Sequence, residues 1–161
     1  MTTQIINDCL PIDFFRDLQG RVMHHAFMWE FVPALNEEQT NNEDTYFAHT
    51  AYHHDVPTSD FFNMVGPLRD YLPDFHCLIR IKINLYPRQR ALVEHTPHRD
   101  HPYPHKGAIL SLNTCDGYTR LEDQIVPSIE NRLLIFDASQ IHNSTSTTTP
   151  PGRFNININY L

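Results

Sequence analysis

The sequence lacks the features of a secreted or membrane-bound protein. Its three cysteines, Cys9, Cys77 and Cys115, are odd in number and far apart, and none belongs to a Cys-x-x-Cys pair. Neither a disulfide framework nor a zinc ribbon is therefore expected. The N-terminus has no basic segment followed by an apolar one, as a secretory signal requires. No apolar run approaches the ~20 residues that cross a bilayer. We therefore expect a cytoplasmic protein that does not bind membranes.

Basic residues are also scarce. Twelve Lys and Arg residues oppose 19 Asp and Glu residues, and the formal net charge is -7. The composition does not supply a broad basic surface for a phosphate backbone, which disfavours nucleic acid as a partner. The 161 residues suffice for one domain with its own core. The sequence gives no indication of the oligomeric state.

Histidine, in contrast, is abundant, with 11 residues in this short chain. Imidazole is the commonest metal ligand in proteins, and it titrates near neutral pH. A metal site is therefore the first functional hypothesis.

Residues 1–76 are expected to form a helical part that precedes and supports a β domain. Apolar residues recur at three- and four-residue steps over 11–20 and 59–71, which predicts two helices. A Gly-Pro pair inside the second pattern is expected to kink that helix. The segment 36–45 is polar and acidic and is expected to be a loop.

From residue 77 to residue 161, short β patterns alternate with turn residues. Apolar and polar residues alternate over 78–86 and again over 153–160, which predicts strands with one apolar and one polar face. Shorter strands are expected at 108–113, 125–127, 133–136 and near 142, with a tight turn at Asp116-Gly117.

These strands suit a double-stranded β-helix, or jelly roll, in which two antiparallel sheets pack together. The fold class is thus mainly β with N-terminal helices. If the helices cover the apolar faces, the polar faces of 78–86 and 153–160 point into the roll. Buried polar groups need partners, and a polar ligand would supply them.

One constellation stands out within the β region. His98 and Asp100 are two residues apart, so on an extended segment both side chains leave the same face. His53-His54-Asp55 offers a second pair of this kind, but no predicted strands surround it in a suitable order. His142 follows one predicted strand, and Arg153 begins the last one. Two imidazoles and a carboxylate on neighbouring positions of one ion form the facial triad of non-haem Fe(II) oxygenases.

In this order of parts, the sequence resembles the 2-oxoglutarate/Fe(II)-dependent oxygenases, in particular the small, single-domain, prolyl-4-hydroxylase-like forms often carried by phages. The resemblance covers about half of the chain strongly and the N-terminal part loosely. The residues that carry it are Arg80–Tyr86, His98-Arg99-Asp100, Asn113–Thr119, Glu130–Asp137, Ile141-His142 and Gly152–Asn159.

The resemblance implies that His98, Asp100 and His142 bind Fe(II), which 2-oxoglutarate chelates through its C1 carboxylate and keto oxygen. Arg153 would hold the far carboxylate, because a guanidinium is a permanently charged fork that binds carboxylates with two hydrogen bonds. Asn84 and Tyr86 resemble the polar residues that hydrogen-bond the same cosubstrate, and Tyr86 is the better candidate.

Arg80 and Lys82 share the polar face of 78–86 and are rival partners for a carboxylate. We expect them to lie farther from the metal end, and so we rank both below Arg153.

The implied reaction uses O₂ to decarboxylate 2-oxoglutarate to succinate and CO₂ and to hydroxylate a second substrate, with ascorbate as an optional reductant. The expected substrate is a peptidyl residue or a small molecule. The loops that choose it are expected at 36–58 and 87–106. No signature in them names the target.

Two other functions remain open at this stage. The chain could be a non-catalytic jelly-roll module with a structural polar interior. It could also be a zinc hydrolase with the same three ligands, although that hypothesis gives Arg153 no role. Most of the other histidines are expected to pack, and His95 and His101 flank the candidate metal segment without an assigned role.

Overall fold

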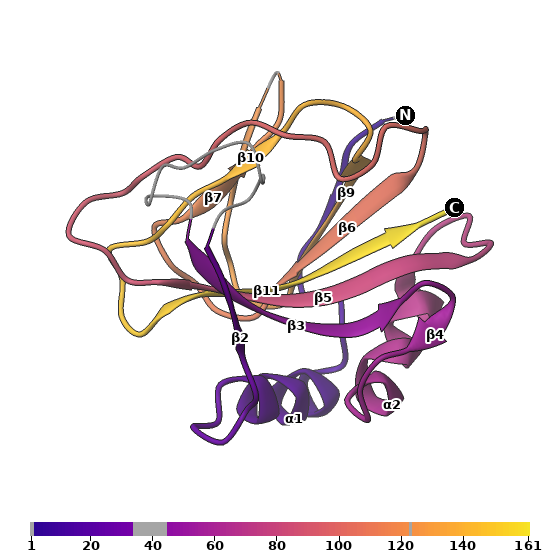
Figure 1. Cartoon of the computed structure of the whole chain (residues 1–161), viewed down its shortest axis with the longest axis horizontal. Helices are drawn as coiled ribbons and strands as arrows, with labels where there is room; N and C mark the ends of the chain where they lie inside the picture. Colours follow the sequence, from indigo (N-terminus) through magenta and orange to yellow (C-terminus); the bar gives the residue numbers. More distant parts are fainter. Residues whose placement is uncertain (1, 34–44, 123) are drawn as a thin grey trace.

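The computed structural model describes residues 2–33, 45–122 and 124–161. Two layers of antiparallel strands and a helical layer make up the fold (Figure 1). None of the helices in these segments has the length and apolarity needed to span a membrane.

The larger layer is an eight-stranded sheet. In spatial order its strands are β1 (Gln4–Ile6), β9 (Arg132–Asp137), β6 (Lys106–Ser111), β11 (Gly152–Tyr160), β5 (Leu78–Pro87), β3 (Tyr46–His53) and β2 (Glu30–Val32), with β4 (Val56–Pro57) paired to β3. The longest pairing joins the first and the last strand of the predicted β region, β5 and β11.

The smaller layer is a sheet in the order β10 (Asn143–Ser144), β7 (Tyr118–Arg120) and β8 (Ile125–Pro127). The segment after β5 runs beside the segment that contains β10, through isolated bridges at Arg88–Thr147, Glu94–Thr145 and His98–His142. Figure 1 shows the two sheets facing each other. The predicted jelly roll is confirmed.

Two helices lie under the larger sheet, on the side away from the smaller one (Figure 1). Helix α1 (Ile12–Val22) buries Phe15, Leu18 and Val22 in the main core. This helix confirms the one predicted over 11–20. The second predicted helix is divided into α2 (Phe62–Val65) and a 3-10 helix, η2 (Gly66–Tyr71). The change falls at the Gly66-Pro67 pair, where proline cannot donate a backbone hydrogen bond.

The predicted two-faced strands are also confirmed. Ile81 and Ile83 of β5 and Ile156 and Ile158 of β11 lie in the core between the larger sheet and α1. Their polar neighbours point the other way, into the roll, and many of them are buried there. These are Asn84, Tyr86, Arg153, Asn155, Asn157 and Asn159.

Residues 1–76 contain the two predicted helices but also β1, β2, β3 and β4, which the sequence pattern did not predict. β3 pairs with β5 along most of its length and carries an irregularity between Thr50 and Tyr52. Part of the expected substrate loop 36–58 is thus a strand. The predicted acidic loop at 36–45 lies almost entirely outside the described residues.

The expected tight turn at Asp116-Gly117 is wrong. These residues belong to the longer connection between β6 and β7. The Asp116 carboxylate accepts a hydrogen bond from the backbone N–H of Thr148 at 2.9 Å, so it joins two neighbouring loops at one end of the roll.

Candidate active site

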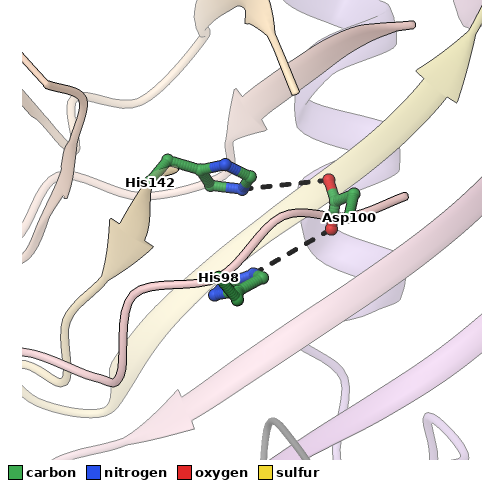
Figure 2. Close-up of side chains that lie close together, drawn as sticks. All are labelled: His98, Asp100 and His142. Atoms are coloured by element: carbon green, nitrogen blue, oxygen red, sulfur yellow. Dashed lines mark ion pairs between the residues drawn. The ribbon is translucent and has the colours of Figure 1, made fainter. Parts of the chain in front are cut away.

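His98, Asp100 and His142 come together, as the sequence predicted. One ligand atom from each residue lies within 4.8 Å of the others. Nε2 of His98 lies 4.0 Å from Oδ1 of Asp100, and Nε2 of His142 lies 3.9 Å from Oδ2. Figure 2 shows the two rings and the carboxylate pointing toward one another. They face a common point that an ion can occupy.

Backbone pairing sets this geometry. The N–H of His98 donates to the carbonyl of His142 at 2.9 Å, and the N–H of His142 donates to the carbonyl of His98 at 3.0 Å. The backbone of Asp100 is held in turn by the carbonyl of Ala138 at 3.2 Å. Residues more than forty positions apart therefore meet through a local antiparallel bridge.

Both imidazoles are oriented by a carbonyl oxygen of their own segment. Nδ1 of His142 lies 3.0 Å from the carbonyl of Gln140, and Nδ1 of His98 lies 3.2 Å from that of Thr96. A carbonyl can only accept, so each Nδ1 carries the proton and each Nε2 presents a lone pair to the centre. Burial lowers the pKa of His142, which favours the neutral form that a metal binds.

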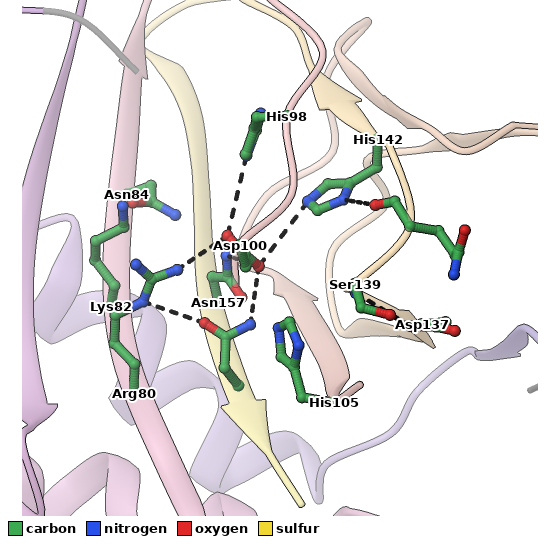
Figure 3. Close-up of polar contacts among 12 residues, drawn as sticks. Arg80, Lys82, Asn84, His98, Asp100, His105, Asp137, Ser139, His142 and Asn157 are labelled. Atoms are coloured by element: carbon green, nitrogen blue, oxygen red, sulfur yellow. Dashed lines mark hydrogen bonds and ion pairs between the residues drawn. The ribbon is translucent and has the colours of Figure 1, made fainter. Parts of the chain in front are cut away.

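Asp100 is buried and held as a carboxylate. Nη2 of Arg80 lies 2.9 Å from Oδ1 (Figure 3), and Nδ2 of Asn159 lies 2.8 Å from Oδ2. Burial alone would raise the pKa of Asp100, but the positive charge of Arg80, the nearby His142 and the Asn159 hydrogen bond outweigh it and hold the pKa well below its ordinary range. The expectation that Arg80 lies far from the metal end is wrong.

The donor set suits a divalent transition metal. Two neutral imidazole nitrogens and one carboxylate are ligands that bind Fe(II) and leave other coordination positions open. Carbonyl partners on the outer nitrogens of the histidines are the usual second layer of such sites. The residues present therefore fit the implied ion.

Arg153 lies inside the roll with 1% of its surface exposed. Its Nε donates to Ser128 Oγ at 2.7 Å, its Nη2 to Thr119 Oγ1 at 2.9 Å and its Nη1 to the Thr145 carbonyl at 3.2 Å. Its guanidinium carbon lies 5.4 Å from the centre of the Tyr86 ring. Burial lowers the pKa of Arg153, yet no carboxylate among the described residues pairs with it.

A small internal cavity joins this guanidinium to the candidate metal centre. Its lining residues are Asn84, Tyr86, His98, Ile109, Thr119, His142, Ser144, Arg153, Asn155 and Asn157. An anion that enters this cavity can contact Arg153 at one end while it approaches both histidines at the other.

Several solved structures of known proteins resemble this chain. No family model and no curated protein matches the sequence, but solved structures match the fold. A Pseudomonas putida prolyl-4-hydroxylase aligns over 98% of this chain and 91% of its own, with a TM-score of 0.64 at 16% identity. A Trichoplax adhaerens prolyl hydroxylase, solved with a peptide fragment of hypoxia inducible factor, covers 99% and 83%, with a TM-score of 0.62 at 14% identity.

The epimerase SnoN of nogalamycin biosynthesis, solved with Fe3+, alpha ketoglutarate and nogalamycin RO, covers 99% of this chain and 78% of its own, with a TM-score of 0.66 at 14% identity. The chain has the fold of the 2-oxoglutarate- and Fe(II)-dependent oxygenases. The predicted resemblance is confirmed at the level of the fold.

Within this oxygenase fold, both predicted cosubstrate residues line the cavity. Asn84 donates to Asn155 Oδ1 at 3.0 Å. Tyr86 is buried beneath Arg153, and its ring lies 5.0 Å from that of His95. His95 is buried as well, and its Nδ1 lies 2.8 Å from Ser144 Oγ, so it supports the wall of the cavity.

The remaining histidines lie outside the candidate metal centre. His101 packs against Tyr103 and His105, with ring centres 5.2 and 5.1 Å away. The rings of His53 and His54, at the end of β3, lie 3.8 Å apart and are tilted by 37°. In the described parts of the chain, none of these histidines belongs to a group of three side chains that could hold a metal ion.

Sequence reasoning missed the residues that hold the site in place. Arg80 and Asn159 fix Asp100, while Ser128 and Thr119 fix Arg153. The alternation of β5 and β11 already placed Arg80 and Asn159 on the inward face. This alternation was the one feature of the sequence from which their place near the site could have been predicted. The loop that brings Asp100 to them carries no pattern.

Proposed function

We propose that this protein is a 2-oxoglutarate- and Fe(II)-dependent oxygenase that hydroxylates a peptidyl residue or a small molecule. The observation that carries the proposal is the buried, unmatched charge of Arg153, in a cavity that also contains the two imidazoles. A buried cation without an anion is costly, and a dicarboxylate cosubstrate supplies the missing charge. Residues 1–161 would form one catalytic domain, because β3 of the N-terminal half completes the sheet beside β5.

His98, Asp100 and His142 would hold Fe(II), and Arg153 would bind the far carboxylate of 2-oxoglutarate. When bound, the metal and the cosubstrate together supply the activation of O₂ and the oxidative decarboxylation that yields succinate and CO₂. Tyr86 forms the wall beneath the Arg153 guanidinium, and Asn84 offers an amide farther along the cavity.

The chain's own part in the reaction is to position groups and control charge. Three hydrogen bonds hold the Arg153 fork before the cosubstrate arrives, so little conformational freedom is lost on binding. The charge of Arg80 helps to hold the pKa of Asp100 well below its ordinary range, so the carboxylate is ionised at neutral pH. The carbonyl partners of His98 and His142 keep their protons away from the metal.

The identity of the primary substrate follows from neither fold nor triad. The similar structures include both kinds of bound molecule: SnoN was solved with a small molecule, and the Trichoplax enzyme with a peptide. A zinc hydrolase would use the same three ligands but would leave Arg153 without a task. A structural module would not need a buried guanidinium beside an open ligand set.

The test is release of succinate from 2-oxoglutarate in the presence of Fe(II) and O₂, measured with a panel of peptides and metabolites. Turnover without added substrate gives the baseline. We expect Arg153→Ala to raise KM for 2-oxoglutarate by at least about 100-fold, since it removes a buried charge-assisted pair. Arg21→Ala, on the exposed face of α1, should leave it unchanged. Full turnover by Arg153→Ala, or none by the wild type, would reject the proposal.

A further inference from the structure

One more cation lies on the inward face of the roll, and neither the candidate metal centre nor the Arg153 site uses it. The chain has two lysines. Lys106 pairs with Asp74 at 3.0 Å, and the Asp74 side chain is 81% exposed. Lys82 lies on β5 between Arg80 and Asn84 (Figure 3), on the inward face, and is partly buried. Its position calls for a partner of opposite charge.

Within the described segments, none of the contacts of Lys82 supplies a negative charge. Its Nζ donates to the hydroxyl of Tyr46 at 2.8 Å and lies 5.1 Å from the centre of the same ring. No carboxylate among the described residues lies within 4.0 Å of it. An ammonium carries three N–H donors, so the hydrogen bond to Tyr46 leaves donors for a ligand.

The charges around Lys82 do not balance. Arg80, Lys82 and Arg153 place three cations on the inward faces of β5 and β11, and Asp100 is the one carboxylate paired with any of them in the described chain. Asp100 is already engaged by Arg80 and by the candidate metal centre. If 2-oxoglutarate occupies the site of Arg153, the charge of Lys82 is still unmatched.

Two amide oxygens next to Lys82 also lack partners, and they call for hydrogen-bond donors on the substrate beside its carboxylate. Oδ1 of Asn84 and Oδ1 of Asn157 are buried and accept no hydrogen bond. Asn157 lies opposite Lys82 in the pairing of β5 with β11, and its Nδ2 lies 3.4 Å from Asp100. A polar group bound at Lys82 would therefore sit one side chain away from the candidate metal centre.

Lys82 and Arg153 lie on neighbouring strands and make different contacts. β5 lies between β11, which carries Arg153, and β3, which carries Tyr46. Lys82 is turned toward β3, because its hydrogen bond goes to Tyr46. The Tyr46 ring stacks on that of Tyr86 at 5.4 Å, so a group bound to Lys82 would lie beside the wall of the Arg153 site.

We propose that Lys82 and Tyr46 bind a carboxylate of the primary substrate, so that this oxygenase acts on a carboxylate-bearing molecule. This inference rests on the proposed function and names its substrate class. The carboxylate can belong to an acidic side chain of a peptide or to a free acid, since the ammonium recognises the same group in both. Burial and, to a smaller extent, the charge of Arg80 lower the pKa of Lys82 to about 8 against the opposing effect of Asp100; the ammonium is thus present at neutral pH.

The test measures binding by calorimetry, with Mn(II) in place of iron, both with and without 2-oxoglutarate. The probes are pairs that differ only in charge. Blocked tripeptides with a central Glu or Gln, or Asp or Asn, represent the peptide source; N-acetylglycine and N-acetylglycinamide represent the free acid. We expect the acid of at least one pair to bind about 10–100-fold more tightly than its amide, the range for a charged hydrogen bond. The pair that responds identifies the source.

Variants tie this preference to Lys82. Lys82→Met should remove it, Lys82→Arg should retain part of it, and Lys106→Met, which changes the other lysine, should leave it intact. Thermal unfolding confirms that each variant is folded. Equal affinities for acid and amide in every pair, no binding by any probe, or a preference that survives in Lys82→Met would overturn the inference.

A rise in KM for 2-oxoglutarate in Lys82→Met, with unchanged discrimination between acid and amide, would also overturn it, because Lys82 would then serve the cosubstrate. Failure of the proposed function has a different signature. In that case neither the wild type nor Lys106→Met releases succinate, whatever the calorimetric preference.

Discussion

Arg153 owes its orientation partly to a residue that has no side chain. A Cβ atom placed on Gly117 would lie 2.7 Å from Cδ of Arg153 and 2.8 Å from the carbonyl oxygen of Ser146. Both distances are shorter than van der Waals contact, so the connection between β6 and β7 can pass this arginine only as glycine. The expected turn residue thus leaves room for the side chain of Arg153.

Gly117→Ala should therefore displace the guanidinium. We expect KM for 2-oxoglutarate to rise about tenfold or more, because misplacement by about 1 Å is enough for such losses, while the affinity for Mn(II) stays the same. Gly20→Ala is the control, since a Cβ there meets nothing within 4 Å and alanine favours a helix by about 1 kcal/mol. An unchanged KM in Gly117→Ala would show that the loop makes room for the added methyl group, and it would contradict this role of Gly117.

Lys82 should lower the stability of the folded chain. Its ammonium is buried beside Arg80, with Asp100 as the nearby opposite charge and Tyr46 as hydrogen-bond acceptor, and its pKa falls to about 8. Lys82→Met should then raise the free energy of unfolding by about 2 kcal/mol at pH 7. A side chain whose removal stabilises the folded protein is typically one that is retained for binding.

The sign of the pH dependence follows from the lowered pKa. Below pH 8 the lysine is protonated in both states and the full penalty is present. Between about pH 8 and 10.4 the folded wild type loses the proton while the unfolded chain keeps it, so the wild type gains stability as the pH rises. Urea denaturation of both proteins across this range should show the advantage of Lys82→Met shrinking. A constant difference would contradict the buried charge.

At the scale of helices and strands, sequence patterns predicted what local periodicity determines. β5 and β11 alternate strictly, and α1 repeats its apolar side chains at helical steps, so all three were found. β3 was missed because its inward residues include alanine, threonine and tyrosine rather than a row of aliphatic side chains, and because the irregularity after Thr50 interrupts the alternation. Such interruptions hide strands from pattern analysis.

Helix α1 stabilises the larger sheet and does not touch the metal site. Leu18 is fully buried in the main core. Leu18→Ala should lower the free energy of unfolding by about 3 kcal/mol, the usual cost of such a cavity, and leave KM for 2-oxoglutarate unchanged. Arg21→Ala, on the exposed side of the same helix, should cost less than about 0.5 kcal/mol. Urea denaturation measures both, and a loss of activity in folded Leu18→Ala would argue against this separation.

At the scale of the whole molecule, the site exists only once distant segments have met. The meeting of His98, Asp100 and His142 could be predicted from residue types, order and spacing, because a jelly roll brings His98 next to His142. The pairing of Arg80 with Asp100 and the hydrogen bonds of Ser128 and Thr119 to Arg153 could not, since they depend on loops that have no periodicity. Sequence therefore indicated the candidate ligands, and structure revealed the residues that hold them.

The most direct test of this account is an anaerobic titration with Fe(II) and 2-oxoglutarate, followed by visible absorption. Chelation of iron by the cosubstrate should produce a weak charge-transfer band that saturates at about one iron per chain, as a single three-ligand site requires. His142→Ala should lose the band, and His76→Ala, which changes an exposed histidine, should keep it. No band in the wild type, or an undiminished band in His142→Ala, would contradict the account.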